Sequence, residues 1–211
     1  MARPSMHRFF LFAVLVFFLG LLARPHAVFA DDPVVWKVEE DWELNTFQSD
    51  PVIFSPQVTF FSTPDDRDPE TYFQLQINYA ADDSFSAGGF HVAAYKESTN
   101  VDEERSNQQI TLSLPSDSLQ WTSVMAVVDS QLLFAVKDGV GQEWGGFGGP
   151  EYLVRIDGTT ASDLDHYSYN NSLANVDIGF GKNRVASIKL NRIRLFYSDG
   201  SITTTELAQA P

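Results

Sequence analysis

Residues 34–44 read Val-Val-Trp-Lys-Val-Glu-Glu-Asp-Trp-Glu-Leu, and this stretch decides the class of fold. Its even positions are apolar apart from Glu40, and its odd positions from Lys37 to Glu43 are charged. Successive side chains of a β-strand point to opposite faces, so this period of two predicts a strand with one buried face and one solvated face.

The same period of two continues along the rest of the chain. Strands are predicted at Gln57–Ser62, Tyr72–Tyr79, Phe90–Tyr95, Gln108–Leu114, Leu119–Val128, Leu132–Val136, Tyr152–Ile156, Leu173–Ile178, Val185–Tyr197 and Ile202–Leu207. Loops are predicted at Thr63–Glu70, Glu97–Asn107, Asp138–Pro150 and Asp157–Asn171. Many short strands separated by turns predict an all-β fold, an antiparallel two-sheet β-sandwich with jelly-roll-like connections.

Three local signals refine this prediction. Asp129-Ser130 and Asp199-Gly200 each lie between two predicted strands and are candidate turns of β-hairpins. Within Val185–Tyr197 the apolar residues change from even to odd positions near Asn191-Arg192. A slip of one residue in this phase predicts a β-bulge.

The first thirty residues differ from the rest and predict a secretory signal peptide. Basic residues precede a 14-residue apolar run, Phe9–Leu22, and Val28-Phe29-Ala30 leads into an acidic segment. Such a run is shorter than the roughly 20 residues of a membrane span. We therefore expect residues 31–211 to form a single β-sandwich domain without a membrane span. A secreted, periplasmic or cell-envelope location is expected, and the absence of cysteine fits a bacterial envelope protein.

The charge of the chain argues against some partners. Three of its 14 Lys and Arg residues and none of its 28 Asp and Glu residues lie in residues 1–30, so the remainder has a formal charge of −17. Such a surface repels nucleic acids, and no nucleic-acid partner is expected.

The segment Leu119–Gly139 carries a resemblance to a known superfamily. A strand containing Trp121, a tight turn, a second strand and a closing Asp138-Gly139 resemble a hairpin of the concanavalin A-like lectin and glucanase domains. The resemblance implies the sandwich architecture and leaves activity open, because one fold serves many functions.

The acidic residues Glu39, Asp41 and Glu43 are candidate catalytic residues. They alternate along one strand, which spaces their Cα atoms about 6–7 Å apart on one face. Retaining glycosidases use two carboxylates about 5–5.5 Å apart. The Glu-x-Asp-x-Glu pattern also resembles the catalytic strand of one glucanase family, which implies Glu39 as nucleophile and Glu43 as acid/base.

A structural alternative exists for the same three acids. Five cations are concentrated near the predicted penultimate strand, namely Lys182, Arg184, Lys189, Arg192 and Arg194. First and last strands of sandwiches are often neighbours, and opposite charges on neighbouring strands stabilise a sheet. Cross-strand ion pairs are therefore the alternative interpretation of the acidic strand.

Two further groups of residues are candidate binding sites. Amides bind hydroxyl groups and aromatic rings pack on sugars, which predicts a glycan-binding surface from Gln74, Gln76, Asn78, His91, Tyr95, Trp144 and Phe147. The alternative is that the amides solvate an outer sheet and Trp144 caps the core. The acids Asp65, Asp66 and Asp68 offer clustered oxygens for a structural calcium ion, although they match no EF-hand loop and form an ordinary solvated turn in the alternative.

These observations leave three hypotheses of function. The leading one is an exported, non-catalytic module that binds a glycan or another extracellular ligand or envelope component. The second is a glycoside hydrolase that uses the carboxylates of the first strand. The third is a structural or protein-interaction module of the cell envelope. No cofactor is indicated apart from the calcium hypothesis.

Overall fold

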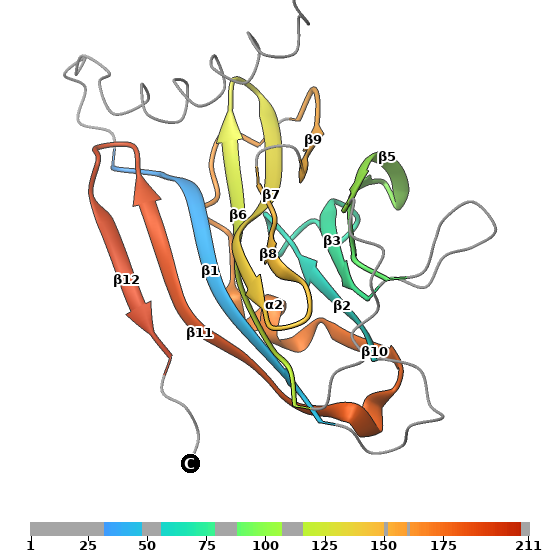
Figure 1. The fold of residues 1–211 in the computed structure, drawn as a ribbon. Coiled ribbons are helices and arrows are strands. Elements are labelled where there is room, and N and C mark those ends of the chain that lie inside the picture. The colour runs from blue at the N-terminus through green and yellow to red at the C-terminus, as the bar shows by residue number, and fades with distance from the viewer. Residues whose placement is uncertain are drawn as a thin grey trace, which may run out of the picture. The chain divides into compact units, whose positions relative to one another are not determined.

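The structure of this chain is a computed structural model that describes residues 32–47, 56–78, 88–106, 116–149, 152–159 and 161–207. These residues form a seven-stranded and a five-stranded antiparallel sheet. The two sheets pack face to face as a β-sandwich (Figure 1). The predicted fold class is confirmed. The predicted signal peptide, residues 1–30, and the predicted strand Gln108–Leu114 lie outside the described residues.

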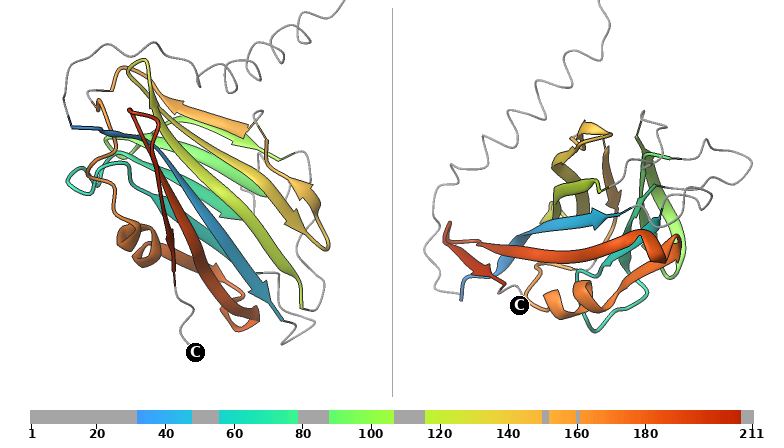
Figure 2. Two further views of the ribbon diagram at one scale, coloured as in Figure 1. Left: turned by 90° about the vertical axis from the view of Figure 1, so that its left-hand side faces the viewer. Right: turned by 60° about the horizontal axis from the view of Figure 1, so that its bottom comes forward.

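The seven-stranded sheet contains the first strand at its centre. Its strand order is β12-β11-β1-β6-β7-β8, and β9 also pairs with β7. The bounds are β1 Val35–Thr46, β6 Ser118–Val128, β7 Gln131–Gly141, β8 Gly145–Phe147, β9 Leu153–Ile156, β11 Val185–Tyr197 and β12 Ile202–Glu206. The first strand is therefore a neighbour of the penultimate strand β11, as the sequence indicated (Figure 2).

The five-stranded sheet has the order β10-β2-β3-β4-β5. Its bounds are β2 Gln57–Ser62, β3 Tyr72–Ile77, β4 Phe90–Lys96, β5 Thr99–Arg105 and β10 Val176–Phe180. The short helix α2, Tyr169–Ala174, precedes β10. The chain crosses between the sheets from β1 to β2, from β5 to β6, from β9 to β10 and from β10 to β11.

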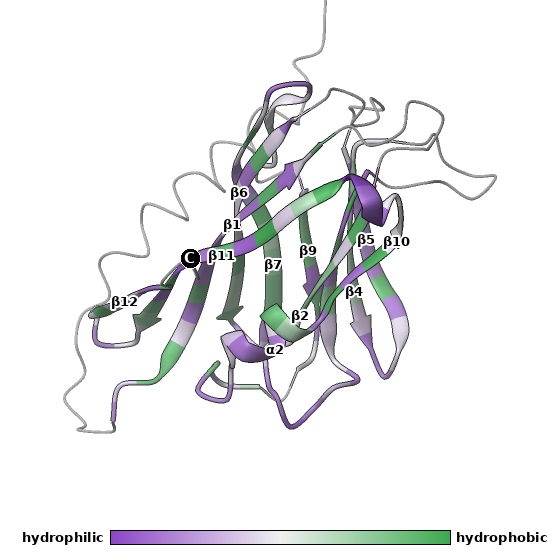
Figure 3. Ribbon diagram, turned by 90° about the horizontal axis from the view of Figure 1, so that it is seen from below, coloured by the Kyte–Doolittle hydropathy of each residue, from purple (hydrophilic) through white to green (hydrophobic). Residues whose placement is uncertain are grey.

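The core lies between the inward faces of the two sheets. Phe73, Leu75 and Ile77 of β3 are completely buried, while the residues between them are half-buried. Figure 3 shows the alternation of hydrophobic and hydrophilic bands along the strands, β11 among them. The inner face of β1 contributes Trp42, whose ring lies 5.1 Å from the ring of Phe60 on β2. Aromatic contacts across the two layers thus join the sheets.

The predicted turns and the bulge are confirmed. Asp129 and Ser130 both have positive φ angles, 49° and 63°, which is the geometry of a tight hairpin turn between β6 and β7. Gly200 has φ 89° in the turn between β11 and β12. The register of β1 against β11 shifts by one residue at Asn191, where the apolar phase changes.

Three predicted boundaries are wrong. The predicted loop Glu97–Asn107 contains β5, because Glu97 and Ser98 form a tight turn with φ 51° and 58° and return the chain onto β4. Its exposure on the sheet edge explains its polar sequence. The start of the predicted strand Leu173–Ile178 belongs to helix α2, and the predicted loop Asp138–Pro150 contains the end of β7 and all of β8.

Candidate functional site

The acidic residues of β1 form a cross-strand ladder on the outer face of the seven-stranded sheet. Glu39 lies opposite Arg194, Asp41 opposite Arg192, and Glu43 opposite Lys189. This is the cross-strand ion pairing that the concentration of cations near the penultimate strand indicated.

Asp41 is the most fully paired carboxylate of the ladder. It accepts hydrogen bonds from Arg192 Nε at 2.7 Å, Arg194 Nη2 at 2.9 Å and Thr122 Oγ1 at 2.7 Å. Burial raises the pKa of Asp41, but the hydrogen bonds from Thr122 and Arg192 and the charges of both arginines outweigh it and lower the pKa.

Glu39 is paired in the same way by three cations. Lys137 Nζ lies 2.8 Å from its carboxylate, Arg194 Nη2 3.0 Å and Lys37 Nζ 3.1 Å. Burial acts to raise the pKa of Glu39, yet the hydrogen bond from Lys137 and the charge of Lys37 lower it overall. A general acid needs a raised pKa, so neither Glu39 nor Asp41 is prepared to donate a proton near neutral pH.

A different surface forms on the outer face of the five-stranded sheet. Gln74 and Gln76 of β3 lie there, opposite Ala93 and His91 of β4. Both ring nitrogens of His91 have partners, with Nδ1 at 2.9 Å from Gln76 Oε1 and Nε2 at 3.1 Å from Glu103 Oε2. Burial lowers the pKa of His91 and outweighs the opposite effect of Glu103.

This polar row continues onto β5. Asn100 Nδ2 donates a hydrogen bond to the same Oε2 atom of Glu103 at 3.0 Å. The side chain of Glu103 is 43% exposed, so the row ends at solvent. Gln76, His91, Glu103 and Asn100 therefore form one connected polar network across three strands.

Three half-buried aromatic rings lie on the same face, across β2, β3 and β4. The ring of Tyr72 lies 5.8 Å from that of Phe61 and stacks on that of Tyr95 at 4.7 Å. We call Phe61, Tyr72 and Tyr95 the aromatic row. Tyr72 and Tyr95 each cover one face of the other ring, so only part of each ring is left to contact a ligand.

The sequence pattern predicts part of this face. Gln74, Gln76, His91 and Tyr95, which were predicted as site residues, are brought together by the structure. Phe61, Tyr72 and Glu103 were not among the predicted site residues. Tyr72 shares the even-numbered phase of Gln74 and could have been found, whereas Glu103 lay in a segment predicted to be a loop.

Asn78 does not contribute to the outer face. It has φ 57° at the end of β3, where the strand turns, and it is 4% exposed. Its Nδ2 donates a hydrogen bond to the carbonyl oxygen of Pro56 at 3.1 Å. The expectation that Asn78 continues the row of Gln74 and Gln76 is therefore wrong.

Trp144 and Phe147 are buried, contrary to the expectation of exposed rings in a glycine-rich loop. They are 3% and 8% exposed and pack against each other at 5.5 Å and against Phe90. A Cβ atom at Gly139 would lie 2.6 Å from the ring of Phe147, so the glycine makes room for this ring. The two aromatic residues belong to the core and have no ring face available for a sugar.

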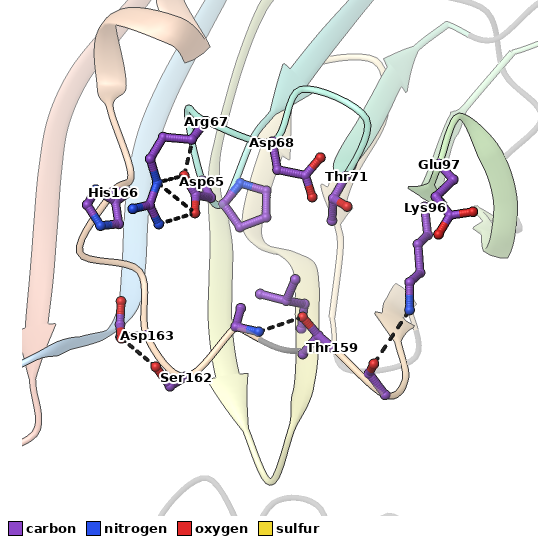
Figure 4. A pocket seen from close by; sticks show the side chains of 14 residues that line it. Asp65, Arg67, Asp68, Thr71, Lys96, Glu97, Thr159, Ser162, Asp163 and His166 are labelled. Carbon is purple, nitrogen blue, oxygen red and sulfur yellow. Dashed lines mark hydrogen bonds and ion pairs between the residues drawn. The ribbon is translucent and has the colours of Figure 1, made fainter.

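The acidic turn expected to bind calcium lines an open pocket of about 610 Å³ (Figure 4). In it Arg67 donates hydrogen bonds to both carboxylate oxygens of Asp65, Nε to Oδ1 at 2.9 Å and Nη2 to Oδ2 at 2.6 Å. This pairing with Arg67 lowers the pKa of Asp65 to about 2. In the part of the chain that the structure describes, no three His, Asp or Glu side chains are grouped to hold a metal ion, and Asp65, Asp66 and Asp68 form no such group.

Comparisons with known proteins identify no relative of this chain. No protein family, curated protein or solved structure matches this chain. Among the described residues, no helix has the length and apolar character needed to cross a membrane.

Proposed function

We propose that this chain is an exported, non-catalytic binding module and that its ligand, a glycan, lies on the outer face of the five-stranded sheet. The observation that carries the proposal is the aromatic row of Phe61, Tyr72 and Tyr95 beside the polar network of Gln76 and His91. Aromatic rings offer apolar area to a sugar, and neighbouring amide and carboxylate groups can hydrogen-bond its hydroxyls.

The chemistry of this face suits hydroxyl-rich ligands. The amides of Gln74 and Gln76 can both donate and accept hydrogen bonds, as sugar hydroxyls do. Glu103 uses one oxygen, Oε2, toward both His91 and Asn100, which leaves Oε1 to accept from a ligand. Tyrosine adds apolar area with a polar end.

The outer face of the other sheet supports glycoside hydrolysis less well. There the carboxylates of Glu39 and Asp41 are held by arginine and lysine side chains, and both have lowered pKa values. A retaining or inverting glycosidase needs one carboxyl group with a raised pKa beside the other carboxylate. The ladder therefore favours a structural role for β1.

The proposal is tested by depletion of the purified protein, residues 31–211, from solution by a panel of insoluble polysaccharides. Tyr72→Ala removes the central ring of the aromatic row. We expect it to weaken binding about tenfold, or about 1.4 kcal/mol, as for an anchoring aromatic residue. Phe47→Ala is the matched control, because Phe47 is an exposed aromatic residue that follows β1, a strand of the other sheet.

The outcomes separate clearly. Depletion by one polymer that Tyr72→Ala weakens and Phe47→Ala leaves unchanged supports the proposed face. Equal binding by both variants places the ligand elsewhere, and no depletion by any polymer overturns the glycan proposal. Thermal unfolding of each variant shows whether a loss of binding reflects a loss of fold.

A further inference from the structure

Glu40 is a carboxyl group inside the sandwich, on the inward face of β1. It occupies an even position of the alternating strand, where every neighbour of the same phase is apolar, and it is 1% exposed. Its partners in the sheet are Ser123 of β6 and Ile193 of β11, neither of which is charged. A buried carboxyl group without a cation is costly to ionise.

The partners of Glu40 are uncharged hydrogen-bonding groups. Tyr167 Oη lies 2.6 Å from Oε1, and Trp42 Nε1 donates to Oε2 at 3.0 Å. Ser172 of α2 is buried beside the carboxyl, although its hydroxyl lies outside good hydrogen-bond geometry. Burial raises the pKa of Glu40, and the hydrogen bonds offset this effect only in part.

Among the described residues, the charged side chains next to Glu40 in β1 point away from it. Glu39 and Asp41 lie on the opposite face of β1, paired with the cations of β11 and β7. On the segment packed against Glu40, the titratable group that reaches it is Tyr167, whose hydroxyl lies 2.6 Å from Oε1. Of the other titratable groups of this segment, Asp165 accepts from the N–H of Val35, Asp163 and His166 line the open pocket, and Tyr169 is exposed. β6 and β11 present Ser123 and Ile193.

Both protonation states of Glu40 can be satisfied by these partners. Trp42 Nε1 can only donate, so Oε2 accepts in either state and a bound proton lies on Oε1. The protonated acid then donates to Tyr167 Oη, whereas the ionised carboxylate accepts from the Tyr167 hydroxyl. The difference between the two states is thus a negative charge in the core.

Tyr167 belongs to a segment that joins the two sheets, residues 161–175, which we call the strap. At its start, Leu164 is 2% exposed and its N–H donates to the carbonyl oxygen of Val35 in β1 at 2.7 Å. The N–H of Val35 donates to Asp165 Oδ1 at 2.6 Å. At its end, the carbonyl oxygen of Asn175 accepts from the N–H of Phe61 in β2 at 3.1 Å.

We propose that the strap is a pH-sensitive latch, fastened to the sandwich when Glu40 holds a proton and loosened when Glu40 ionises. The strap covers Glu40 through Tyr167. When Glu40 ionises, movement of the strap away from the sandwich lets water hydrate the carboxylate and so stabilises its charge. The strap also ends on Phe61 of the aromatic row. Loosening therefore acts on the edge of the proposed binding face, but the latch itself does not depend on that function.

The latch is tested by amide hydrogen exchange of the strap between pH 5 and 9, corrected for the intrinsic dependence of exchange on pH. Opening of the strap releases one proton from Glu40 at pH values between the ordinary pKa of Glu and the raised pKa of Glu40 in the closed strap. Across this range the protection of the strap amides should fall by up to about tenfold per pH unit. Unfolding of the whole domain also exposes Glu40, so the protection of β6 amides should fall with a similar slope but from a higher starting level than that of the strap. Equal protection of strap and β6 amides at every pH would show that the strap opens only by global unfolding and would overturn the latch.

Glu40→Gln isolates the group responsible. A glutamine amide accepts from Trp42 and donates to Tyr167, like the protonated acid, so its strap should stay protected throughout the range. Since His166 on the strap is retained, a flat profile assigns the pH dependence to Glu40. Glu39→Gln is the matched control on the opposite face and should keep the wild-type profile.

A second measurement uses the unmodified protein. The ¹³C shift of the Glu40 carboxyl, followed by NMR, should titrate at the upper end of the pH range in which strap protection falls, because the fall ends where the folded carboxyl loses its proton. If Glu40→Gln shows the wild-type pH dependence, if it does not fold, or if the carboxyl titrates at the ordinary pKa of Glu, the latch is refuted.

Discussion

Asp41→Asn tests whether the ladder of β1 is structural. The variant keeps the size of the side chain but removes the charge that faces Arg192 and Arg194, whose side chains are 41% and 26% exposed. Partly exposed ion pairs contribute about 0.5–1 kcal/mol each. With a weakened hydrogen bond from Thr122, we expect a loss of about 1–2 kcal/mol in the free energy of unfolding, or roughly 2–8 °C in Tm.

Urea unfolding at pH 7 measures this loss, and a double-mutant cycle with Arg192→Gln isolates the pair. The coupling energy should be about 0.5–1 kcal/mol. Asp138→Asn is the matched control, because Asp138 is 75% exposed and 3.9 Å from Lys137. Its unfolding should stay within about 0.5 kcal/mol of the wild type.

Two results would refute a structural ladder. One is an unchanged free energy of unfolding in Asp41→Asn at pH 7. The other is a large loss of polysaccharide binding or cleavage at unchanged stability, which would give the carboxylates a functional role. Since the pKa of Asp41 is lowered in the folded state, the penalty should also shrink as the pH falls below about 4.

Three further predictions follow from single sites. Gly148→Ala should destabilise the fold by about 2 kcal/mol or more in urea unfolding, because φ is +83° and the new Cβ would lie 2.6 Å from the carbonyl oxygen of Val136. Trp144→Ala should cost about 3–5 kcal/mol, since its ring is buried in the core, and unchanged stability would contradict that burial. Calcium or chelator should leave the Tm unchanged, because Asp65 is held by Arg67. A rise of Tm with calcium would restore the metal hypothesis.

The strand pattern could be predicted from the sequence because apolar and polar residues alternate along each strand that has one solvated face. Val185–Tyr197 was predicted with the bounds that the structure shows, and its change of phase located the bulge at Asn191. The ladder was also accessible, because five cations lie near one strand and opposite charges on neighbouring strands stabilise a sheet. Three of them, Lys189, Arg192 and Arg194, face the acids of β1. The alternation of apolar and polar residues and the opposite charges of the two strands therefore predicted that β1 and β11 are neighbours in one sheet.

The binding face was only partly predictable, since burial is decided by the whole fold. The composition of Gly145–Phe147 resembles an exposed loop, yet pairing of β8 with β7 carries Phe147 into the core. The polar sequence of β5 resembles a loop because an edge strand can be solvated on both faces. Glu103 could not be assigned to a site before that strand was placed.

The acidic run of β1 divides into two environments, and the division predicts how stability depends on pH. Glu39 and Asp41 have lowered pKa values in the folded state, so their contribution is present above about pH 4 and is lost as the pH falls through those values. Glu40 has a raised pKa, so its contribution is present below about pH 4 and is lost as the pH rises.

Glu40→Gln separates the two effects. Its neutral amide has no proton to lose, so the variant should unfold at higher urea concentration than the wild type near pH 8. The difference should diminish as the pH is lowered toward 4, by at most about 1.4 kcal/mol per unit. Urea midpoints measured across this range provide the test. A difference that is constant with pH would show that Glu40 has the same proton affinity in the folded and unfolded chains. The buried contact with Tyr167 would then have no role in proton binding.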